Sequence, residues 1–232
     1  MIEKSDYLKQ YRSDVEIVNY DKFLNINLSF LPDQWKKIFN SKNDETINKE
    51  IISFWKEKIG HNMNNTISHL EDNLVKAEII KSREEYSVLY TIKSLSGEIN
   101  YYEGKFPKEK FENIKLNEKW ELVPDKLKRF YEEIHNGFYH YSSISMGLMP
   151  LEDVILLEDY EWGILDELEE PLQIDLACTF GFFENGSGDC VAVDLENSGI
   201  DKGVLWFHDD QPDYNINFWD VVDEWINIGL EM

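Results

Sequence analysis

The spacing of apolar residues predicts helices in the first half of the chain. Between residues 44 and 60 the apolar positions recur every three or four residues, as on one helix face: Ile47, Ile51, Phe54, Trp55 and Ile59. Residues 64–80 continue with a similar period through Ile67, Leu70, Leu74 and Val75. We therefore predict two consecutive amphipathic helices in this region.

The period then changes to two, which predicts strands. Residues 85–92 alternate through Tyr86, Val88, Tyr90 and Ile92. A second strand-like stretch, residues 97–106, follows the turn sequence SLSG, so the two stretches predict a hairpin. Pro107 interrupts the pattern, and we place a boundary there: a helix-rich region ending in a β-hairpin over 1–105, and a second domain over 106–232.

The second half begins with a predicted helix over residues 124–135. Pro124 suits a first helical turn, Asn136 and Gly137 end the helix, and one face carries Leu127, Phe130, Tyr131 and Ile134. His135 falls at the C-terminus of this helix, where a positive charge is tolerated. A short strand, a turn and a second short strand or helical turn are expected between residues 143 and 159.

Strand patterns and a closing helix complete the second half. A long half-buried strand is predicted through Leu172, Ile174, Leu176, Cys178 and Phe180, and two more strands over residues 190–195 and 203–208. Asn217 can cap a final helix whose core face holds Phe218, Val221, Val222, Trp225 and Ile226. Together these elements predict an α+β fold.

The stretch GFFENGSGDCVAVDL, residues 181–195, is the one most like a functional loop. It lacks the Lys of a phosphate-binding loop and places Asp189 after Gly188, which would repel phosphate. Asp189 and Asp194 are five residues apart, so on one strand they face opposite ways and cannot converge as paired acids. The Asn185–Gly186 pair between alternating strands instead predicts a hairpin turn, with both aspartates serving the turn and the strand end.

The sequence also gives no support for a calcium site or a catalytic histidine. Residues 194–205 have the spacing of a calcium loop, but Leu205 stands where a bidentate Glu is needed. His208 lies beside Asp209 and Asp210, which would raise its pKa, yet no nucleophile is in sequence reach. We therefore predict no catalytic residue, no metal, no cofactor and no enzymatic activity.

Charge separates the two halves more sharply than any motif does. The net charge is −23; residues 1–118 contribute only −2, whereas residues 119–232 hold 5 Lys and Arg against 26 Asp and Glu, a net −21. Self-repulsion on this scale lowers the stability of the folded chain, which favours a function for the acidic half: steering a basic partner to its surface. The same sign disfavours direct binding to nucleic acid.

The composition bears on the cellular compartment in which the protein is found. No apolar run approaches the ~20 residues of a membrane-spanning helix, and the first residues lack a secretory signal core. The two cysteines, Cys178 and Cys190, lie in apolar stretches without a CxxC pair, so buried free thiols are expected. These features favour a cytoplasmic protein without membrane contact.

Roughly residues 105–232 carry a series of motifs in a fixed order: a Pro-started helix ending in Asn-Gly, a Pro-containing turn, a Gly-rich turn with Asp, an apolar strand ending in Asp, and a strand with a late aromatic. In this order they resemble the SUKH superfamily, the group of cell-wall-assembly regulators and bacterial immunity proteins. The matching residues are Pro124, Asn136, Gly137, Pro150, Gly188, Asp189, Asp194 and Trp206. Val123 replaces the usual Leu, and Cys190 stands where an aromatic is common.

The resemblance implies an antiparallel or mixed sheet flanked by helices, here with an N-terminal α+β extension that forms either a separate module or more of the same sheet. It also implies an immunity protein that neutralises a cognate, basic, nuclease-type toxin; the alternative is a regulatory scaffold in cell-wall or signalling pathways. Within the acidic half we expect the contacts at Glu158, Asp159, Glu161, Trp162, Asp166, Glu167, Glu169 and Glu170, with a second patch at Asp209, Asp210 and Asp213.

Overall fold

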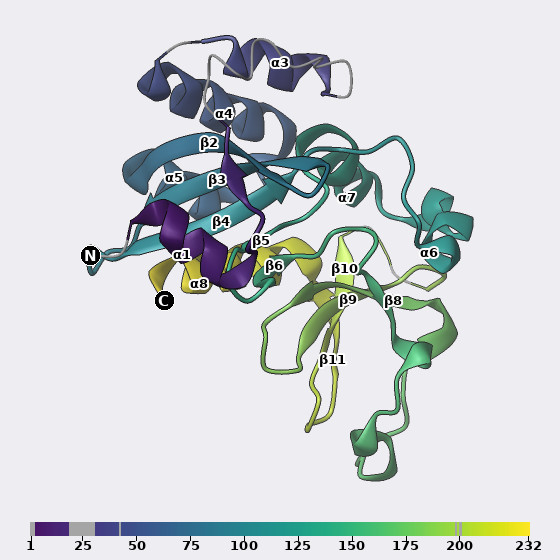
Figure 1. Cartoon of the computed structure of the whole chain (residues 1–232). Coiled ribbons are helices and arrows are strands. Elements are labelled where there is room, and N and C mark those ends of the chain that lie inside the picture. Colours follow the sequence, from purple (N-terminus) through teal and green to yellow (C-terminus); the bar gives the residue numbers. More distant parts are fainter. Residues whose placement is uncertain (1–2, 19–30, 42, 198, 200) are drawn as a thin grey trace.

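One antiparallel sheet runs through both halves of the chain. The computed structural model describes residues 3–18, 31–41, 43–197, 199 and 201–232, and in these the strand order is β1-β2-β3-β4-β5-β6-β8-β9-β10-β11, with β7 paired to β8. The strands are β1 (Glu16–Ile17), β2 (Leu74–Ser82), β3 (Glu85–Lys93), β4 (Ile99–Lys105), β5 (Phe138–His140), β6 (Ser145–Leu148), β7 (Ile155–Leu156), β8 (Thr179–Glu184), β9 (Cys190–Asp194), β10 (Lys202–Trp206) and β11 (Asp213–Asn217). With the helices packed on it (Figure 1), this sheet confirms the α+β class.

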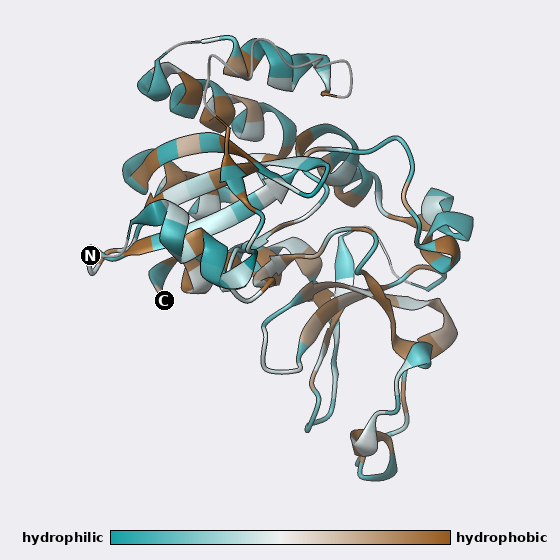
Figure 2. Ribbon diagram, in the orientation of Figure 1, coloured by the Kyte–Doolittle hydropathy of each residue, from teal (hydrophilic) through white to brown (hydrophobic). Residues whose placement is uncertain are grey.

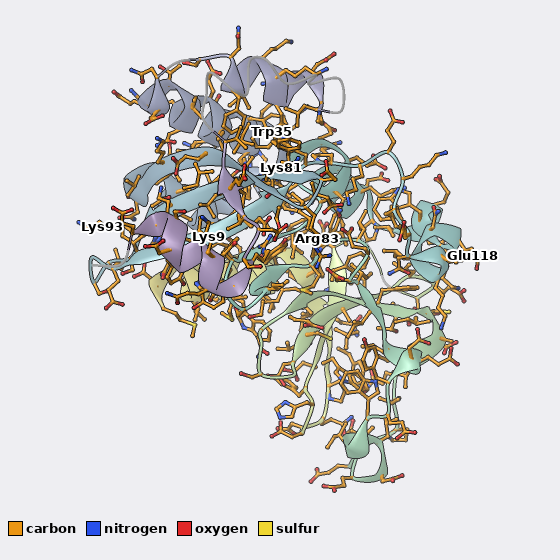
Figure 3. The ribbon with its side chains drawn as sticks, in the orientation of Figure 1. Lys9, Trp35, Lys81, Arg83, Lys93 and Glu118 are labelled. Carbon is orange, nitrogen blue, oxygen red and sulfur yellow. The ribbon has the colours of Figure 1, made fainter. Side chains whose placement is uncertain are left out.

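Most helices cover one face of the sheet. The α-helices are α1 (Lys4–Tyr11), α3 (Asp33–Phe39), α4 (Asp44–Ile59), α5 (Asn64–Asn73), α6 (Ile114–Glu118), α7 (Asp125–Arg129) and α8 (Phe218–Glu231). Residues from α3, α4, α5, α7 and α8 join strand residues such as Val88 and Val191 in the largest hydrophobic cluster. Trp35, labelled in Figure 3, anchors α3 there by donating its indole N–H to the Ile134 carbonyl at 3.0 Å.

The opposite face has two separate covers. On the N-terminal strands, α1 packs Leu8 against Ile80 and Leu89. On β9 and β10, an irregular segment between β7 and β8 packs against Ala192 and Trp206. Neighbouring residues of one strand, such as Val191 and Ala192, therefore serve opposite cores, as the two-residue period of a strand requires. In Figure 2 brown is prominent in β8 and β9, whereas the loop that projects beyond them alternates between brown, white and teal.

The sheet joins the two halves directly. Strand β4, from the predicted N-terminal region, pairs with β5 through Tyr102–His140, Glu103–Tyr139 and Gly104–Phe138. The sequence left open whether the N-terminal part forms a separate module or extends the sheet of the second half. The pairing of β4 with β5 shows that its strands extend that sheet. The predicted hairpin is present as β3 and β4, which are joined through residues 94–98.

Two of the predicted elements are wrong in part. The helix expected over residues 64–80 ends at Asn73, because Leu74–Ser82 form β2 and pair with β3, with one irregularity between Leu74 and Lys76. The long strand expected through Leu172–Phe180 begins only at Thr179. Before it, the Asp175 side chain accepts a hydrogen bond from the Ala177 backbone and starts a short 3-10 helix, Leu176–Cys178, whose Leu176 packs against the cluster around Ala192 and Trp206.

The helix predicted over residues 124–135 is present. The sequence predicts that a positive charge on His135 is tolerated at its C-terminus, but the structure places this side chain in an apolar site. The α-helix passes into a π-helical turn, Phe130–Ile134, and buries the His135 ring completely. Its Nε2 is 2.7 Å from the Tyr90 hydroxyl and its Nδ1 is 3.0 Å from the Lys105 carbonyl oxygen. Burial lowers the His135 pKa to about 3, because no acid compensates a charge in this apolar site.

The pH dependence of stability should report this buried ring. Between pH 6.5 and 3 only the unfolded chain protonates at His135, so this residue lowers the free energy of unfolding by up to about 1.4 kcal/mol per unit fall in pH. Urea unfolding at pH 7, 6 and 5 should give a shallower slope for His135→Gln than for the wild type. His61→Gln, at an exposed position, should leave the slope unchanged, and equal slopes for all three proteins would contradict the assignment.

A buried carboxylate in α8, that of Asp223, caps the N-terminus of α5. Met63 precedes α5 and offers no capping side chain, whereas Asp223 accepts hydrogen bonds from the backbones of Asn65 at 2.9 Å and Thr66 at 2.8 Å. The Asp223 carboxylate thus satisfies amides that helix geometry leaves without partners and adds a negative charge at the positive end of the helix dipole.

Removing this remote cap should be costly. Asp223→Ala leaves the buried Thr66 N–H and the part-buried Asn65 N–H without acceptors, and we expect a loss of about 2 kcal/mol in the free energy of unfolding, measured by urea titration. Asp220→Ala, one turn away on the exposed side of α8, should change it by less than about 0.5 kcal/mol. A loss for Asp220→Ala as large as that for Asp223→Ala would show that the capping bonds are not the cause.

Candidate functional site

The glycine-rich loop between β8 and β9 is a hydrogen-bonded turn. The Asn185 side-chain oxygen accepts from the backbone N–H groups of Ser187 at 2.7 Å and Asp189 at 3.2 Å. The Asn185 backbone N–H donates across the turn to the Asp189 carbonyl at 3.1 Å. Gly186 and Gly188 take φ values of +80° and +105°, which residues with a Cβ rarely adopt. The predicted hairpin turn is thereby confirmed.

Asp189 links this turn to the end of β10. Its Oδ1 accepts from His208 Nδ1 at 2.7 Å and from the His208 backbone at 3.1 Å, and its Oδ2 accepts from Asn185 Nδ2 at 2.8 Å. Partial burial alone would raise the Asp189 pKa, but these donors lower it overall. The His208 pKa is raised as predicted, although the largest cause is the hydrogen bond to Asp189; Asp209 adds a smaller effect.

Asp194 lies apart from Asp189 and serves the next turn. Its side chain is buried and accepts from the backbone N–H groups of Glu196 and Asn197, both at 3.1 Å, and from Asn197 Nδ2 at 3.0 Å. The two aspartates do not converge on a common point. Residues 198 and 200 of the calcium-like segment lie outside the described part of the chain.

The acidic segment, which we define as residues 158–170, projects beyond β8–β11 (Figure 1). Its irregular backbone is held by Trp162, whose indole N–H donates to the Leu157 carbonyl at 2.7 Å and whose ring packs on Trp206 with 5.2 Å between centroids. Trp162 is half-buried by this contact and so anchors the segment to the sheet. Tyr160, next to it, is 51% exposed and Leu165 is 38% exposed.

The predicted contact residues are nearly all at the surface. The seven acids of the segment are exposed, as are the three of the second patch: Glu158, Asp159, Glu161, Asp166, Glu167, Glu169, Glu170, Asp209, Asp210 and Asp213. Of these ten acids, only Asp159, with Lys115, and Asp209, with His208, form an ion pair with a described residue. The other eight are exposed and form no ion pair with any residue that the structure describes.

The structure brings the two acidic patches together. Gln211 accepts from the Glu170 backbone at 3.3 Å and donates to the Glu170 carbonyl at 3.4 Å, so the end of the acidic segment is clamped beside residues 209–213. Around this clamp is a hollow of about 400 Å³, lined by Glu169, Glu170, Gln173, Gln211, Pro212, Asp213, Tyr214 and Asn215. Sequence reasoning missed Gln211 and Tyr160: an isolated amide and one more aromatic carry no signal of their roles.

The N-terminal half presents a different surface. Lys9, Lys81, Arg83 and Lys93 lie over its strands and α1 (Figure 3), and many of its acids are neutralised by lysines of the same half. A larger hollow, of about 1070 Å³, is also found here, between the β2–β3 turn and the residues around Phe111 and Trp120. Its lining mixes lysines, glutamates and aromatic rings, without the single charge sign of the acidic end.

The motif residues of the second half occupy structural positions. Pro124 precedes α7, Trp206 is fully buried, and the Asn136 side chain accepts from the Leu151 backbone at 2.8 Å. Gly137 has φ +88°, and a Cβ there would lie 2.6 Å from the Pro150 nitrogen. The Asn136–Gly137 pair therefore closes the helix onto the Pro150 turn.

Both cysteines are buried free thiols, as predicted. Burial raises the pKa of each, and most strongly that of Cys190, which leaves both thiols protonated at neutral pH. Lys119 Nζ approaches Cys178 Sγ to 3.4 Å, but its stronger contact is with Glu196 at 2.8 Å.

Comparisons of the chain with family models, with curated proteins and with solved structures found no match. None of the helices in the described ranges combines the length and the apolar composition that crossing a bilayer needs. The site is therefore defined by its own geometry: an exposed, hydrogen-bonded acidic surface with interspersed aromatic and apolar side chains.

Glycine should be required at residue 137 and dispensable at residue 163. Gly137→Ala forces a Cβ into backbone atoms at a positive φ, and we expect a loss of about 2–4 kcal/mol in the free energy of unfolding. Gly163→Ala, inside the acidic segment, meets no atom within 4 Å and should change it by less than about 0.5 kcal/mol. Thermal and urea unfolding measure both; a neutral Gly137→Ala would refute the steric account.

Proposed function

We propose that this chain is an immunity protein that binds and neutralises a basic, nuclease-type toxin domain through its acidic end. The observation that carries the proposal is the pairing pattern: eight exposed carboxylates on residues 158–170 and 209–213 form no ion pair within the described chain. Keeping like charges together costs folding free energy, and a cationic partner would relieve that cost.

The surface also has the composition of a protein-binding site. Tyr160 and Leu165 supply exposed apolar area among the acids, and aromatic residues are enriched at the centres of interfaces. The Trp162–Trp206 contact and the Gln211 clamp hold the segment, which reduces the entropy lost on binding. A nuclease must attract phosphate with basic residues, so an acidic surface of this kind competes for the same groups.

The resemblance of residues 105–232 to SUKH proteins supports the same function, because many bacterial members are immunity proteins. It also favours a cytoplasmic protein, since an immunity protein of that kind acts where its toxin is made. The proposal involves no catalysis, cofactor or direct contact with nucleic acid.

Charge reversal tests the proposal. The variant Glu161→Lys/Glu167→Lys/Glu169→Lys should weaken binding to the basic toxin domain encoded beside this gene by at least about 100-fold, and it should abolish protection of cells expressing that domain. The matched control, Glu50→Lys/Asp72→Lys/Glu98→Lys, makes the same change in charge at exposed, unpaired acids of the N-terminal half and should retain most binding.

Calorimetry or interferometry at increasing salt concentration gives an independent measure of the electrostatic contribution to toxin binding. Wild-type affinity should fall steeply with ionic strength because the contacts lie at the solvent-exposed surface. Tight binding that neither salt nor the triple reversal at the acidic segment changes would overturn the electrostatic mechanism. Failure to bind or protect against the toxin, with capture of cell-wall or signalling proteins instead, would favour the regulatory scaffold.

A further inference from the structure

Three side chains of the kind that ligate metals meet where the β8–β9 turn contacts the segment after β10. One ligand atom from each of Asp189, His208 and Asp209 lies within 4.8 Å of the others. The histidine separates this group from an ordinary acidic cluster, because imidazole nitrogen is a preferred ligand of transition metals and a poor one for calcium or magnesium.

The His208 ring is held in one orientation. Asp189 Oδ1 accepts from Nδ1 at 2.7 Å, and Asp189 is itself held by Asn185 at 2.8 Å. The ring lies against Gly188, where a Cβ would be only 3.0 Å from His208 Cγ, so the glycine makes this approach possible. When Nδ1 carries the proton of a neutral ring, Nε2 keeps its lone pair. A carboxylate on the remote nitrogen is the usual support of a metal-binding histidine.

The free nitrogen faces a second ligand at a suitable distance. His208 Nε2 is 3.6 Å from Asp209 Oδ2. Two bonds of about 2.1 Å at a tetrahedral angle span about 3.4 Å, so one ion between these atoms needs only a small side-chain adjustment. Both side chains are largely exposed, at 47% and 73%, which leaves room for water or a group of another molecule to complete the coordination.

We propose that His208 Nε2 and Asp209 Oδ2 bind a divalent transition-metal ion, best Zn²⁺, with Asp189 as the positioning residue that holds the imidazole. Zn²⁺ accepts mixed nitrogen and carboxylate ligands in four-coordinate geometry, which this pair begins and solvent can finish. The inference does not depend on the toxin proposal, because it requires no partner protein.

Calorimetric titration of the full chain with Zn²⁺ alone is the test. The wild type should bind one ion through this site, and His208→Ala and Asp209→Asn should each lower the affinity at least about 10-fold. His61→Ala, at an exposed histidine elsewhere, and Asp210→Asn, one residue beyond the site, should bind like the wild type. Far-UV circular dichroism checks that every variant is folded.

The role of Asp189 needs a separate readout. Asp189→Asn should lower Zn²⁺ affinity about 10- to 100-fold, and NMR of the ring nitrogens should show that His208 loses its single tautomer. Unchanged affinity and an unchanged tautomer in Asp189→Asn would overturn the positioning role.

Two outcomes would overturn the site itself. One is the absence of Zn²⁺ binding, or equal binding by wild type and His208→Ala. The other is Ca²⁺ binding as tight as Zn²⁺ binding and equally insensitive to His208→Ala, which would indicate general attraction of cations to the acidic surface.

Discussion

The pairing of β4 with β5 joins the two halves of the sheet, and the buried His135 bridges the same junction. His135 packs its ring against Gly104, where any Cβ would lie within 2.5 Å of the ring, and bonds both Tyr90 of β3 and the Lys105 carbonyl at the end of β4. One neutral side chain thus connects the end of the α7 region to two strands of the N-terminal half. The helices on that face and the continuous sheet both depend on this junction.

The charges follow the same division between the halves. In the N-terminal half, ion pairs are part of the packing: Arg12 bonds buried Glu103, which also accepts from the hydroxyls of Ser87 and Tyr139. At the other end of the sheet, Asp189 and Asp194 hold turns by hydrogen bonds, but eight exposed carboxylates of residues 158–170 and 209–213 form no ion pair with the described residues and repel one another. The segment that carries them stays ordered through apolar and amide contacts, Trp162 on Trp206 and Gln211 on Glu170, which are insensitive to charge.

Local signals made much of the fold predictable. Helix α4, the β3–β4 hairpin, the Asn185 turn and the Asn217-capped α8 all follow from residues close in sequence. The errors arose where distant contacts decide. Strand β2 exists because β3 pairs with it, and His135 is neutral because Tyr90 and Gly104 enclose it. The contact residues could be proposed from charge alone, but the Glu170–Gln211 clamp spans 41 residues and has no signal in the sequence.

The separation of charge along the sheet has a consequence for the approach of another molecule. Residues 152–213, around strands β7–β11, hold 18 Asp and Glu against one Lys, whereas residues 1–118 have a net charge of only −2; joined through one sheet, they give the protein a large electric dipole moment, directed along the sheet. In the field of a basic molecule such a dipole experiences a torque as well as an attraction. The protein therefore rotates before contact, so that its first collisions already present the end formed by β8–β11.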